Sequence, residues 1–413
     1  MIVERRVEAE KINSSKKWVL VYGRRKTGKS FLVEKFVSYD EYFFVNRDRT
    51  ILSKRDNRII SYDAFVEILL RELSSKKCVV VDEFHRLGEP FFDLLHAVSK
   101  DGKLIAITST LNLAKKLVAE HSSLLGYFNE IQIPIISLDE VLEALTPYGL
   151  ANADLLEVAT IMREPIAIDY FDNRTSARET IAKILMGSKN SVPALFGEIF
   201  IEEEKSIAAT YEGIVRSVAG GKVVSGEIAS SLFSKKLIPK DDPSIIQPYL
   251  NTLINLGILR RIKVFGKNKN VYKIASPLMR LFFYADEKYG ISMRDFTEAE
   301  AIRIVDEIMP RIVEDAIREE LAHKFGLAES VLEASDYDVD GLLLRFNKPE
   351  VLLEVKWGKR LSRNDITGII NSMKKFDAKR KFLFVRDKKG FEYLEAEGIK
   401  PIDVESLKTL KPS

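Results

Sequence analysis

Apolar runs alternate with helix-like stretches in the first third of the chain. Residues 18–22 (WVLVY) form a short apolar run that ends at Gly23, and the FLVEKFV segment after Ser30 carries apolar residues at helical spacing. Further apolar runs occur at 78–81, at 104–107 and in the IQIPII segment around residue 133. Strands that alternate with helices predict an α/β fold, in which a parallel sheet is covered by helices and binds ligands at the carboxyl ends of its strands.

The hydrophobic pattern then changes. Residues 138–205 show mainly helical periodicity and few strand candidates. Residues 206–285 begin with three amphipathic stretches, followed by an alternating segment that turns at Gly266-Lys267-Asn268. Three helices followed by a hairpin are the pattern of a winged helix.

The last part of the chain, residues 286–413, returns to mixed periodicity. It holds a long helical stretch, two apolar strands that we expect to join at Asn347-Lys348-Pro349, and a further strand, KFLFV. A chain of 413 residues is too long for one ordinary core, so several units are expected.

The composition narrows the class of protein. Hydrophobic residues make up 46% of the chain and charged residues 30%, which is typical of a globular protein, and the segment at the start is charged, without the apolar core of a signal peptide. No apolar run approaches the ~20 residues that a membrane-spanning helix needs. Cys78 is the only cysteine, which excludes a disulfide framework and a cysteine-based zinc site. We therefore expect a cytoplasmic protein that does not associate with membranes.

The charges are nearly balanced. A net charge of +3 arises from 64 basic and 61 acidic side chains, so contact with nucleic acid would have to come from local patches. Gln132 and Gln247 are the only glutamines beside abundant Lys, Arg and Glu. This bias, in which labile amides are few and ion pairs are many, favours a thermophilic source.

A phosphate-binding motif with the spacing G-x-x-x-x-G-K-S follows the first strand. Its residues are Gly23, Arg24, Arg25, Lys26, Thr27, Gly28, Lys29 and Ser30. The glycines allow a tight turn in which several backbone N–H groups point at one phosphate, and the following helix adds its positive amino-terminal end. We expect Lys29 to reach the β- and γ-phosphates and the Ser30 hydroxyl to ligate Mg²⁺. The motif lies between a strand and a helix, which disfavours the alternative of a plain glycine-containing turn.

Polar residues also follow the next two strands of the expected sheet. Asp82 stands where an acidic group holds Mg²⁺, and Glu83 is placed to polarise the water that attacks the γ-phosphate. Thr108 and Ser109, at the end of the following strand, could sense the γ-phosphate through hydrogen bonds. The alternative for each pair is a solvated strand end. With Lys29, these residues predict an ATPase that binds ATP or ADP with Mg²⁺.

In this order, GRRKTGKS, VVVDEF and ITST resemble the archaeal ATPase family within the STAND and AAA-like branch of P-loop proteins. The resemblance covers nearly the whole chain, and the segment VERRVEAEKI at the start resembles the family's segment near the adenine through Glu4, Arg5 and Glu8. The resemblance implies four domains, which are a P-loop ATPase core (1–137), a helical lid (138–205), a winged helix (206–285) and a restriction-endonuclease-like α/β domain (286–413).

One departure from the family pattern concerns an arginine. Family members usually carry a Gly-Arg pair after the third strand, and that arginine is taken to stabilise charge on the γ-phosphate. Here Gly126 is followed by Tyr127, which cannot supply a positive charge. An arginine finger is worth about three to five decades in rate. We therefore expect slow ATP hydrolysis, unless another residue such as Arg163 serves.

Basic residues cluster on the expected wing and before the third helix of the winged helix. They are Arg260, Arg261, Lys263, Lys267 and Lys269 on the wing, with Lys235, Lys236 and Lys240 before the helix. Such a cluster can neutralise several phosphates of double-stranded DNA while the third helix enters the major groove. The alternative is a solvated hairpin or a module that docks against another domain, and the sequence leaves both open.

An acidic constellation occupies the last domain. Glu314 lies on the long helix, Asp340 near the start of a strand, and strand alternation places Glu354 and Lys356 on one face of the next strand. Asp340 and Glu354 would hold a Mg²⁺ or Mn²⁺ ion that activates water, while Lys356 orients the nucleophile. The arrangement resembles the PD-(D/E)xK nuclease fold, in which Glu314 matches the helix acid and joins the metal site. The alternative is a strand face with alternating charges.

Two functions follow from these features. In the first, ATP binding and slow hydrolysis arrange the lid, the winged helix and the tail, so that the tail acts on double-stranded DNA as a metal-dependent nuclease. In the second, the ATPase and the winged helix form a regulatory or transcription switch whose nuclease-like tail is catalytically silent. Either organisation is compatible with an oligomer.

Overall fold

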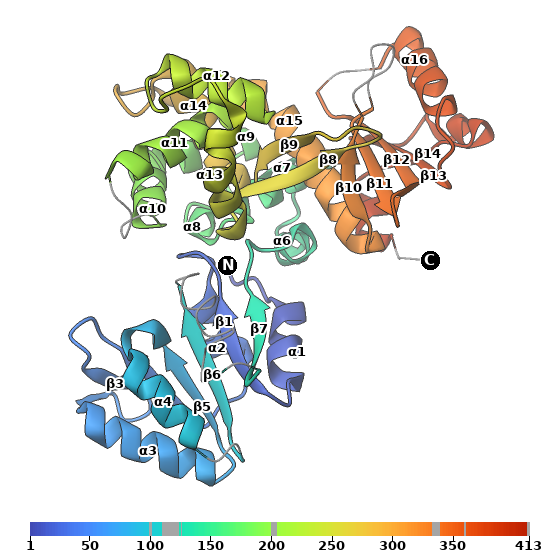
Figure 1. Cartoon of the computed structure of the whole chain (residues 1–413). Coiled ribbons are helices and arrows are strands. Elements are labelled where there is room, and N and C mark those ends of the chain that lie inside the picture. The colour runs from blue at the N-terminus through green and yellow to red at the C-terminus, as the bar shows by residue number, and fades with distance from the viewer. Residues whose placement is uncertain are drawn as a thin grey trace. The chain divides into compact units, whose positions relative to one another are not determined.

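The computed structural model describes residues 1–98, 101–109, 124, 126–199, 205–332, 339–358 and 361–410, with the backbone alone at 199 and 205–207 (Figure 1). The chain divides into two compact units. The first is residues 2–135 with 255–257, and the second is residues 136–254 with 258–413. The expected residue Thr110 lies outside the described residues.

The first unit is built on a seven-stranded sheet with the order β4-β3-β2-β5-β6-β1-β7. Strands β2, β5, β6, β1 and β7 are parallel, and β3 and β4 form an antiparallel edge. The strands are β1 (Trp18–Tyr22), β2 (Glu41–Val45), β3 (Ile51–Ser53), β4 (Arg58–Ile60), β5 (Cys78–Asp82), β6 (Lys103–Thr108) and β7 (Phe128–Gln132). The expected α/β fold is confirmed.

Helices cover both faces of this sheet. The helices are α1 (Arg6–Ser14), α2 (Lys29–Phe36), α3 (Tyr62–Ser74) and α4 (Glu89–Ala97), with a 3₁₀ turn η1 (Phe84–Arg86) after β5. Apolar side chains of α1 and α2 form one core with one face of β1, β5 and β6, and side chains of α3 and α4 form a second core with the other face. Burial on both faces explains why these strands read as continuous apolar runs.

The last strand of this sheet lies earlier in the chain than the apolar pattern suggested. The IQIPII segment was expected to be a strand around residue 133, but β7 ends at Gln132. Pro134 cannot donate a backbone hydrogen bond to a neighbouring strand, so the ladder stops before it.

The second unit begins with a group of helices, as the periodicity of residues 138–205 predicted. They are α6 (Leu138–Leu145), the 3₁₀ turn η2 (Thr146–Tyr148), α7 (Asn152–Met162), α8 (Pro165–Ile168), α9 (Ala177–Gly187) and α10 (Ser191–Ile199). Ser137 caps α6, and Ser176 with Glu179 forms a capping box at α9. These side chains bond backbone N–H groups that a helix start otherwise leaves unpaired.

Three helices and a hairpin follow in the order expected for a winged helix. They are α11 (Lys205–Ala219), α12 (Ser225–Ser234), α13 (Pro243–Asn255), β8 (Leu259–Val264) and β9 (Asn270–Ile274), and α14 (Pro277–Tyr289) comes after them. The hairpin strands pair antiparallel from Leu259↔Ile274 to Lys263↔Asn270.

The rest of the unit is a helix–strand assembly. Its elements are α15 (Glu298–Phe325), β10 (Ala328–Val331), β11 (Gly341–Arg345), β12 (Lys348–Lys356), α16 (Arg363–Lys374), β13 (Arg380–Val385), the 3₁₀ helix η3 (Glu392–Glu397), β14 (Lys400–Ile402) and α17 (Val404–Thr409). Strands β10, β11 and β12 pair antiparallel, whereas β12, β13 and β14 are parallel.

The turn between β11 and β12 differs from the expectation by two residues. The strands join through Phe346 and Asn347, both with positive φ, of 50° and 64°. A two-residue turn with positive φ at both positions matches the twist of a β-hairpin. Lys348 and Pro349 therefore belong to β12 rather than to the turn.

The hairpin β8–β9 and the C-terminal strands form one continuous sheet. Its order is β14-β13-β12-β11-β10-β8-β9, because β10 pairs in parallel with β8 (Figure 1). Ser330 lies opposite Lys263, and its hydroxyl donates to the Lys263 carbonyl at 2.7 Å. The expected wing is thus an edge of the C-terminal sheet. In the described part of the chain, no helix has the length and apolar character needed to cross a membrane.

Candidate functional sites

The phosphate loop connects β1 to α2 and is shaped by its two glycines. A Cβ at Gly23 would lie 2.6 Å from the carbonyl oxygen of Ile133, so no larger residue fits. Gly28 has a φ of 83° and is the N-cap of α2. The loop therefore ends at the amino terminus of a helix, where backbone N–H groups and the helix dipole attract an anion.

Lys29 lies inside this loop. Its ammonium donates to the carbonyl oxygens of Gly23 at 2.9 Å and Arg24 at 2.8 Å. Burial lowers the pKa of Lys29 to about 8, and the carboxylates of Asp82 and Glu83 oppose part of that shift. These two carboxylates therefore lie close enough to act on the ammonium, as the motif spacing predicted.

Asp82 is buried at the end of β5, beside the phosphate loop. Its Oδ1 accepts the N–H of Glu83 at 2.8 Å, and its Oδ2 accepts the hydroxyl of Tyr42 at 2.7 Å. Tyr42 comes from the neighbouring strand β2, and its hydroxyl is also a hydrogen-bond partner of Ser30. Burial and the nearby Asp82 raise the pKa of Tyr42, so the phenol keeps its proton. Tyr42 thus connects the two side chains expected to bind Mg²⁺, a link that the motif did not indicate.

The oxygen donors at this edge suit a magnesium ion. Asp82 supplies a buried carboxylate and Ser30 a hydroxyl, and Mg²⁺ prefers such hard oxygen ligands together with the phosphates of its nucleotide.

Glu83 is turned toward η1. Its φ of 56° is unusual for a residue with a side chain. The carboxylate pairs with Arg86 at 2.6 Å and lies 3.6 Å from His85 Nε2. Arg86 also donates to the carbonyl oxygen of Val45 at 2.7 Å, which fixes it against β2. Glu83 is therefore held by an ion pair in this conformation.

Thr108 and Ser109 lie at the end of β6, between β5 and β1. The Thr108 hydroxyl is fully buried and lies 3.2 Å from His85 Nδ1. The Ser109 hydroxyl is buried and has no hydrogen-bond partner among the described residues. Both residues stand at the carboxyl edge that also carries the phosphate loop, because β6 pairs with β1.

A buried arginine supports the loop from the amino-terminal segment. Arg5 donates to the carbonyl oxygens of Thr27 and Pro134, both at 3.0 Å, and pairs with Glu8 at 2.9 Å. Glu4 instead pairs with the exposed Arg6. Of the three residues in this segment that resemble the family, Arg5 is the one that fixes the phosphate loop.

Tyr127 does not lie at the phosphate loop. It precedes β7, whose first residue, Phe128, is paired with Trp18 at the start of β1. The Tyr127 ring stacks on His96 and meets Trp18 edge to face. Since the phosphate loop follows the other end of β1, no side chain at position 127 would touch a nucleotide bound in the same chain. The replacement of arginine by Tyr127 therefore gives no reason to expect slow hydrolysis of a nucleotide bound in the same chain.

Arg163 forms an ion pair within the second unit. Its guanidinium is buried and makes a bidentate pair with Glu319 of α15, at 2.9 and 2.8 Å. Burial works against the charged carboxylate, but Arg163 and Arg260 overcome this and lower the pKa of Glu319 to about 2. In this conformation Arg163 therefore serves to join the lid to α15 and not to bind phosphate.

The C-terminal acidic residues meet at the end of β12. The Asp340 carboxylate accepts the backbone N–H of Val355 at 2.7 Å. Val355 lies between Glu354 and Lys356, so Asp340 is brought beside both of them. Lys356 forms an ion pair with Glu354, which is only 6% exposed. Asp340 and the E-x-K pair are thus neighbours, as the spacing predicted.

Glu314 belongs to the same neighbourhood. Burial and the negative charge of Asp340 raise the pKa of Glu314 to about 7. The buried Arg318 lies 3.4 Å from Glu314 and donates to the backbone carbonyl of Asp340 at 2.7 Å. Carboxylates that repel one another in this way are the kind of donor set that a divalent cation stabilises. Among the described residues, however, no three His, Cys, Asp or Glu side chains form a ready metal-binding group.

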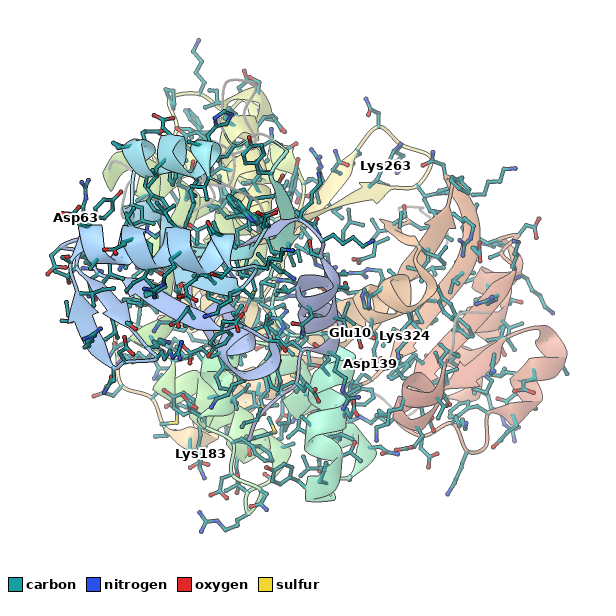
Figure 2. All side chains as sticks on the ribbon, turned by 90° about the horizontal axis from the view of Figure 1, so that it is seen from below. Glu10, Asp63, Asp139, Lys183, Lys263 and Lys324 are labelled. Carbon is teal, nitrogen blue, oxygen red and sulfur yellow. The ribbon has the colours of Figure 1, made fainter. Side chains whose placement is uncertain are left out.

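The basic residues of the wing differ in whether they are paired inside the unit or exposed on its surface. Arg260 is partly buried and paired with Glu329 and, at 3.5 Å, with Glu319, so it points into the unit. Arg261, Lys263 and Lys267 are exposed, and Figure 2 shows Lys263 on the hairpin. Arg260 is therefore excluded from the expected contact with DNA in this conformation.

The basic residues before α13 also differ in whether they form an ion pair. Lys235 pairs with Glu287 at 2.6 Å, whereas Lys236 and Lys240 are exposed. Helix α13, the expected recognition helix, carries no lysine or arginine. Contact with DNA phosphates would therefore depend on the exposed cations beside this helix.

Residues 15–142 match a family model described as an AAA domain. The match spans the phosphate loop, Asp82 and Thr108, so this part of the chain is similar to AAA domains. No curated protein sequence matches the chain.

Three solved structures show partial likeness. The Aeropyrum pernix ORC2 protein with ADPNP and ADP is 12% identical, with a TM-score of 0.38, over 74% of this chain and 93% of that one. The Aeropyrum pernix ORC1 protein in complex with DNA is 15% identical, with a TM-score of 0.31, over 71% and 95%. The restriction endonuclease FokI is 13% identical, with a TM-score of 0.20, over 50% and 44%. None superposes on the chain as a whole at such scores, so the fold assignment rests on the strand order given above.

Proposed function

We propose that the AAA domain binds ATP with Mg²⁺ and controls a C-terminal domain that hydrolyses phosphodiester bonds of DNA. The observation that carries this proposal is the hydrogen bond from Val355 N–H to Asp340, because it holds Asp340 beside both Glu354 and Lys356. A carboxylate pair with an adjacent lysine is the donor set of a PD-(D/E)xK nuclease. We also propose, from the resemblance of its motifs, that the chain belongs with the archaeal ATPases of the STAND and AAA-like branch, and from its composition that it is a cytoplasmic protein of a thermophile.

At the nucleotide, each type of group has a separate task. Lys29 contacts the β- and γ-phosphates, and Ser30 and Asp82 hold Mg²⁺, which neutralises phosphate charge during transfer. Thr108 and Ser109 contact the γ-phosphate. Glu83 orients the attacking water only after it leaves Arg86, so turnover is slow whenever that ion pair persists.

In the C-terminal domain, Asp340 and Glu354 hold Mg²⁺ or Mn²⁺, with Glu314 as a further acidic group. A bound cation activates water and stabilises the charge that develops on the phosphate. With a cation on Glu354, Lys356 would no longer be needed to balance that carboxylate, and its ammonium would be available to orient the nucleophile. Exposed cations of the winged helix, Lys263 among them, hold the duplex through its phosphates.

A second function is favoured by the continuous sheet. The hairpin β8–β9 is paired with β10, and a wing that is fixed in this way serves as a packing element. In that case the chain is a nucleotide-controlled switch in transcription or assembly, and its nuclease-like tail is catalytically silent. Either function allows an oligomer.

A nuclease assay separates the two functions. Supercoiled and linear DNA are incubated with the full chain and Mg²⁺ or Mn²⁺, with and without ATP. We expect metal-dependent cleavage that Asp340→Asn abolishes, and Lys29→Ala to remove its dependence on ATP. Lys400→Ala, an exposed position on β14 that belongs to neither site, serves as the matched control. If the wild-type protein binds ATP and is folded but cleaves no DNA with either metal, the switch is the correct assignment.

A further inference from the structure

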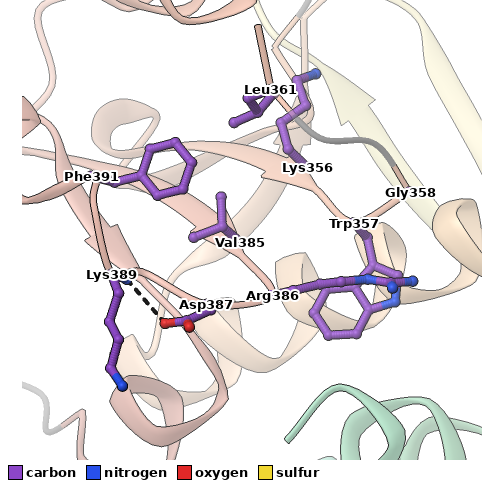
Figure 3. A pocket seen from close by; sticks show the side chains of 9 residues that line it. All are labelled: Lys356, Trp357, Gly358, Leu361, Val385, Arg386, Asp387, Lys389 and Phe391. Carbon is purple, nitrogen blue, oxygen red and sulfur yellow. Dashed lines mark hydrogen bonds between the residues drawn. The ribbon is translucent and has the colours of Figure 1, made fainter.

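A pocket of about 760 Å³ lies at the carboxyl ends of β12 and β13 (Figure 3). Lys356, at the end of β12, and Val385, at the end of β13, both line it. The volume is in the range of small-molecule sites. The carboxyl ends of parallel strands are where such sheets bind ligands.

The pocket has an apolar part. Val385 belongs to the core beneath the sheet, and Leu361 and Phe391 pack against that core while lining the pocket. Phe391 offers an aromatic ring to a flat ligand. An apolar surface of this kind suits a ring system and excludes a simple inorganic anion as the full ligand.

Cations surround this apolar part. Lys356, Arg386 and Lys389 line the pocket, and Asp387 is the acidic residue among the described residues of the lining (Figure 3). The Asp387 carboxylate accepts the backbone N–H of Lys389 at 3.0 Å. This local hydrogen bond partly offsets the negative charge that Asp387 presents to the pocket. A ligand that fits both parts carries a flat apolar ring and a negative group, as a nucleotide does.

Arg386 is fixed in place before any ligand arrives. Its guanidinium lies over the Trp357 ring, 5.2 Å from the centroid, and 3.5 Å from Glu157. Half of the side chain is exposed. Trp357 is held in turn, because its indole N–H donates to Glu157 at 2.7 Å. A planar guanidinium with restricted motion loses little entropy when it binds phosphate.

Lys356 joins the pocket to the acidic site. It lines the pocket and also pairs with Glu354, whose neighbour Val355 holds Asp340. A phosphate that enters between the pocket cations therefore approaches the carboxylates expected to bind metal. A nucleotide bound here would bring the phosphate of a nucleic-acid strand to the acidic site for cleavage. A free nucleotide would gain nothing from that proximity.

We propose that this pocket binds one unpaired nucleotide of a nucleic-acid strand, with its base against Phe391 and Val385 and its phosphate between Lys356, Arg386 and Lys389. The proposal rests on the proposed action of the C-terminal domain on nucleic acid, and it names the substrate as a strand end or an unpaired position. An intact duplex keeps its bases stacked and cannot place one in the pocket.

Binding without cleavage tests the proposal. The full chain carrying Asp340→Asn is titrated, in metal-free buffer, into a labelled single-stranded 12-mer, an abasic 12-mer and a blunt duplex. We expect Lys389→Glu to weaken binding of the single strand about tenfold and to leave duplex binding unchanged. The abasic strand should bind about tenfold more weakly than the normal one, since stacking of one base is worth roughly 1–3 kcal/mol. Lys400→Glu, an exposed charge reversal on β14, should change each affinity less than about twofold.

Each other result overturns the proposal. An unchanged single-strand affinity in Lys389→Glu, or an equal loss for the duplex, excludes a pocket for an unpaired nucleotide. Displacement of the 12-mer by an equimolar amount of deoxythymidine monophosphate assigns the pocket to a free nucleotide instead. Because cleavage plays no part in the measurement, a tail that binds as described but never cuts DNA would contradict the proposed function alone.

Discussion

Tyr42 controls how Asp82 can meet a metal ion. The two oxygens of Asp82 accept from Tyr42 and from the Glu83 N–H, so the carboxylate is fixed before nucleotide binds. The phenol keeps its proton, since burial and the charge of Asp82 raise the pKa of Tyr42. A fixed carboxylate orients the metal without losing rotational freedom at the moment of binding. We therefore expect Tyr42 to position Asp82 for Mg²⁺ and not to contact the nucleotide.

Replacing Tyr42 with phenylalanine isolates that effect. We expect Tyr42→Phe to weaken binding of MgATP about fivefold, which corresponds to the roughly 1 kcal/mol of one hydrogen bond. Binding of ATP without metal should not change, because Lys29 and the loop remain intact. Calorimetric titration with and without Mg²⁺ measures both affinities, and Lys29→Ala should weaken both. Equal losses in Tyr42→Phe with and without metal would show that Tyr42 acts on the loop instead.

The sequence predicts the motif residues well and their supporting residues poorly. Lys29, Ser30 and Asp82 are recognisable because phosphate and metal chemistry fix their spacing. Tyr42 is separated from Asp82 by 40 positions, and Arg5 from Pro134 by 129. These contacts depend on which strands become neighbours, which no local pattern specifies. A tyrosine in an apolar strand gives no sign that its hydroxyl will face an aspartate.

At the scale of elements, the pairing of β10 with β8 makes the expected wing part of the C-terminal sheet. Strand β10 has four residues, AESV, and no apolar alternation that would reveal it. Its pairing with β8 extends the C-terminal sheet to the hairpin, with Ser330 bonded to a carbonyl 67 positions earlier. The pairing also turns Arg260 toward Glu329 and Glu319. The same basic run therefore supplies a structural cation at 260 and surface cations at 261 and 263.

Two alanine variants distinguish these roles. We expect Arg260→Ala to lower the free energy of unfolding of the second unit by about 2 kcal/mol, because Glu329 and Glu319 lose a partner in a partly buried site. Lys263→Ala should change that free energy by less than about 0.5 kcal/mol and reduce the salt dependence of duplex binding by about one unit of slope. Urea unfolding and DNA titrations at several salt concentrations measure both. Arg260 contacts DNA instead if its variant keeps full stability and loses the same salt slope.

At the scale of the whole molecule, the lid is attached to the C-terminal domain by several charged contacts. Glu157 of α7 accepts from Trp357 and pairs with Arg178 at 3.0 Å, and Arg163 pairs with Glu319. Lys324 of α15 also pairs with Asp139 of α6, and Figure 2 shows the two side chains together. The sequence suggested four separate regions, and the domain boundaries remain predictions. The last three regions form one compact unit because buried ion pairs and the β8–β10 pairing connect them.

We expect α7 to carry any effect of ATP to the C-terminal pocket. The chain passes from β7 of the first unit, which ends at Gln132, to α6 of the second unit, which begins at Leu138. Within the second unit, Glu157 is the lid side chain that touches both Trp357 and Arg386 of the pocket. Two sites are coupled when ligand binding at each of them shifts the conformational equilibrium of the same structural element. Because Glu157 makes both contacts, we expect α7 to be that element.

Glu157→Gln should therefore uncouple ATP from strand binding. Glutamine still accepts from Trp357, but it loses the charge that holds Arg178 and Arg386. We expect ATP to change the affinity for the single-stranded 12-mer at least fivefold in the Asp340→Asn background, and less than about twofold once Glu157→Gln is added. Asp306→Asn is the matched control, since Asp306 pairs with Arg178 at 2.8 Å, is exposed and does not touch the pocket. A folded Glu157→Gln variant that retains the full ATP effect would exclude Glu157 as the link between ATP and strand binding.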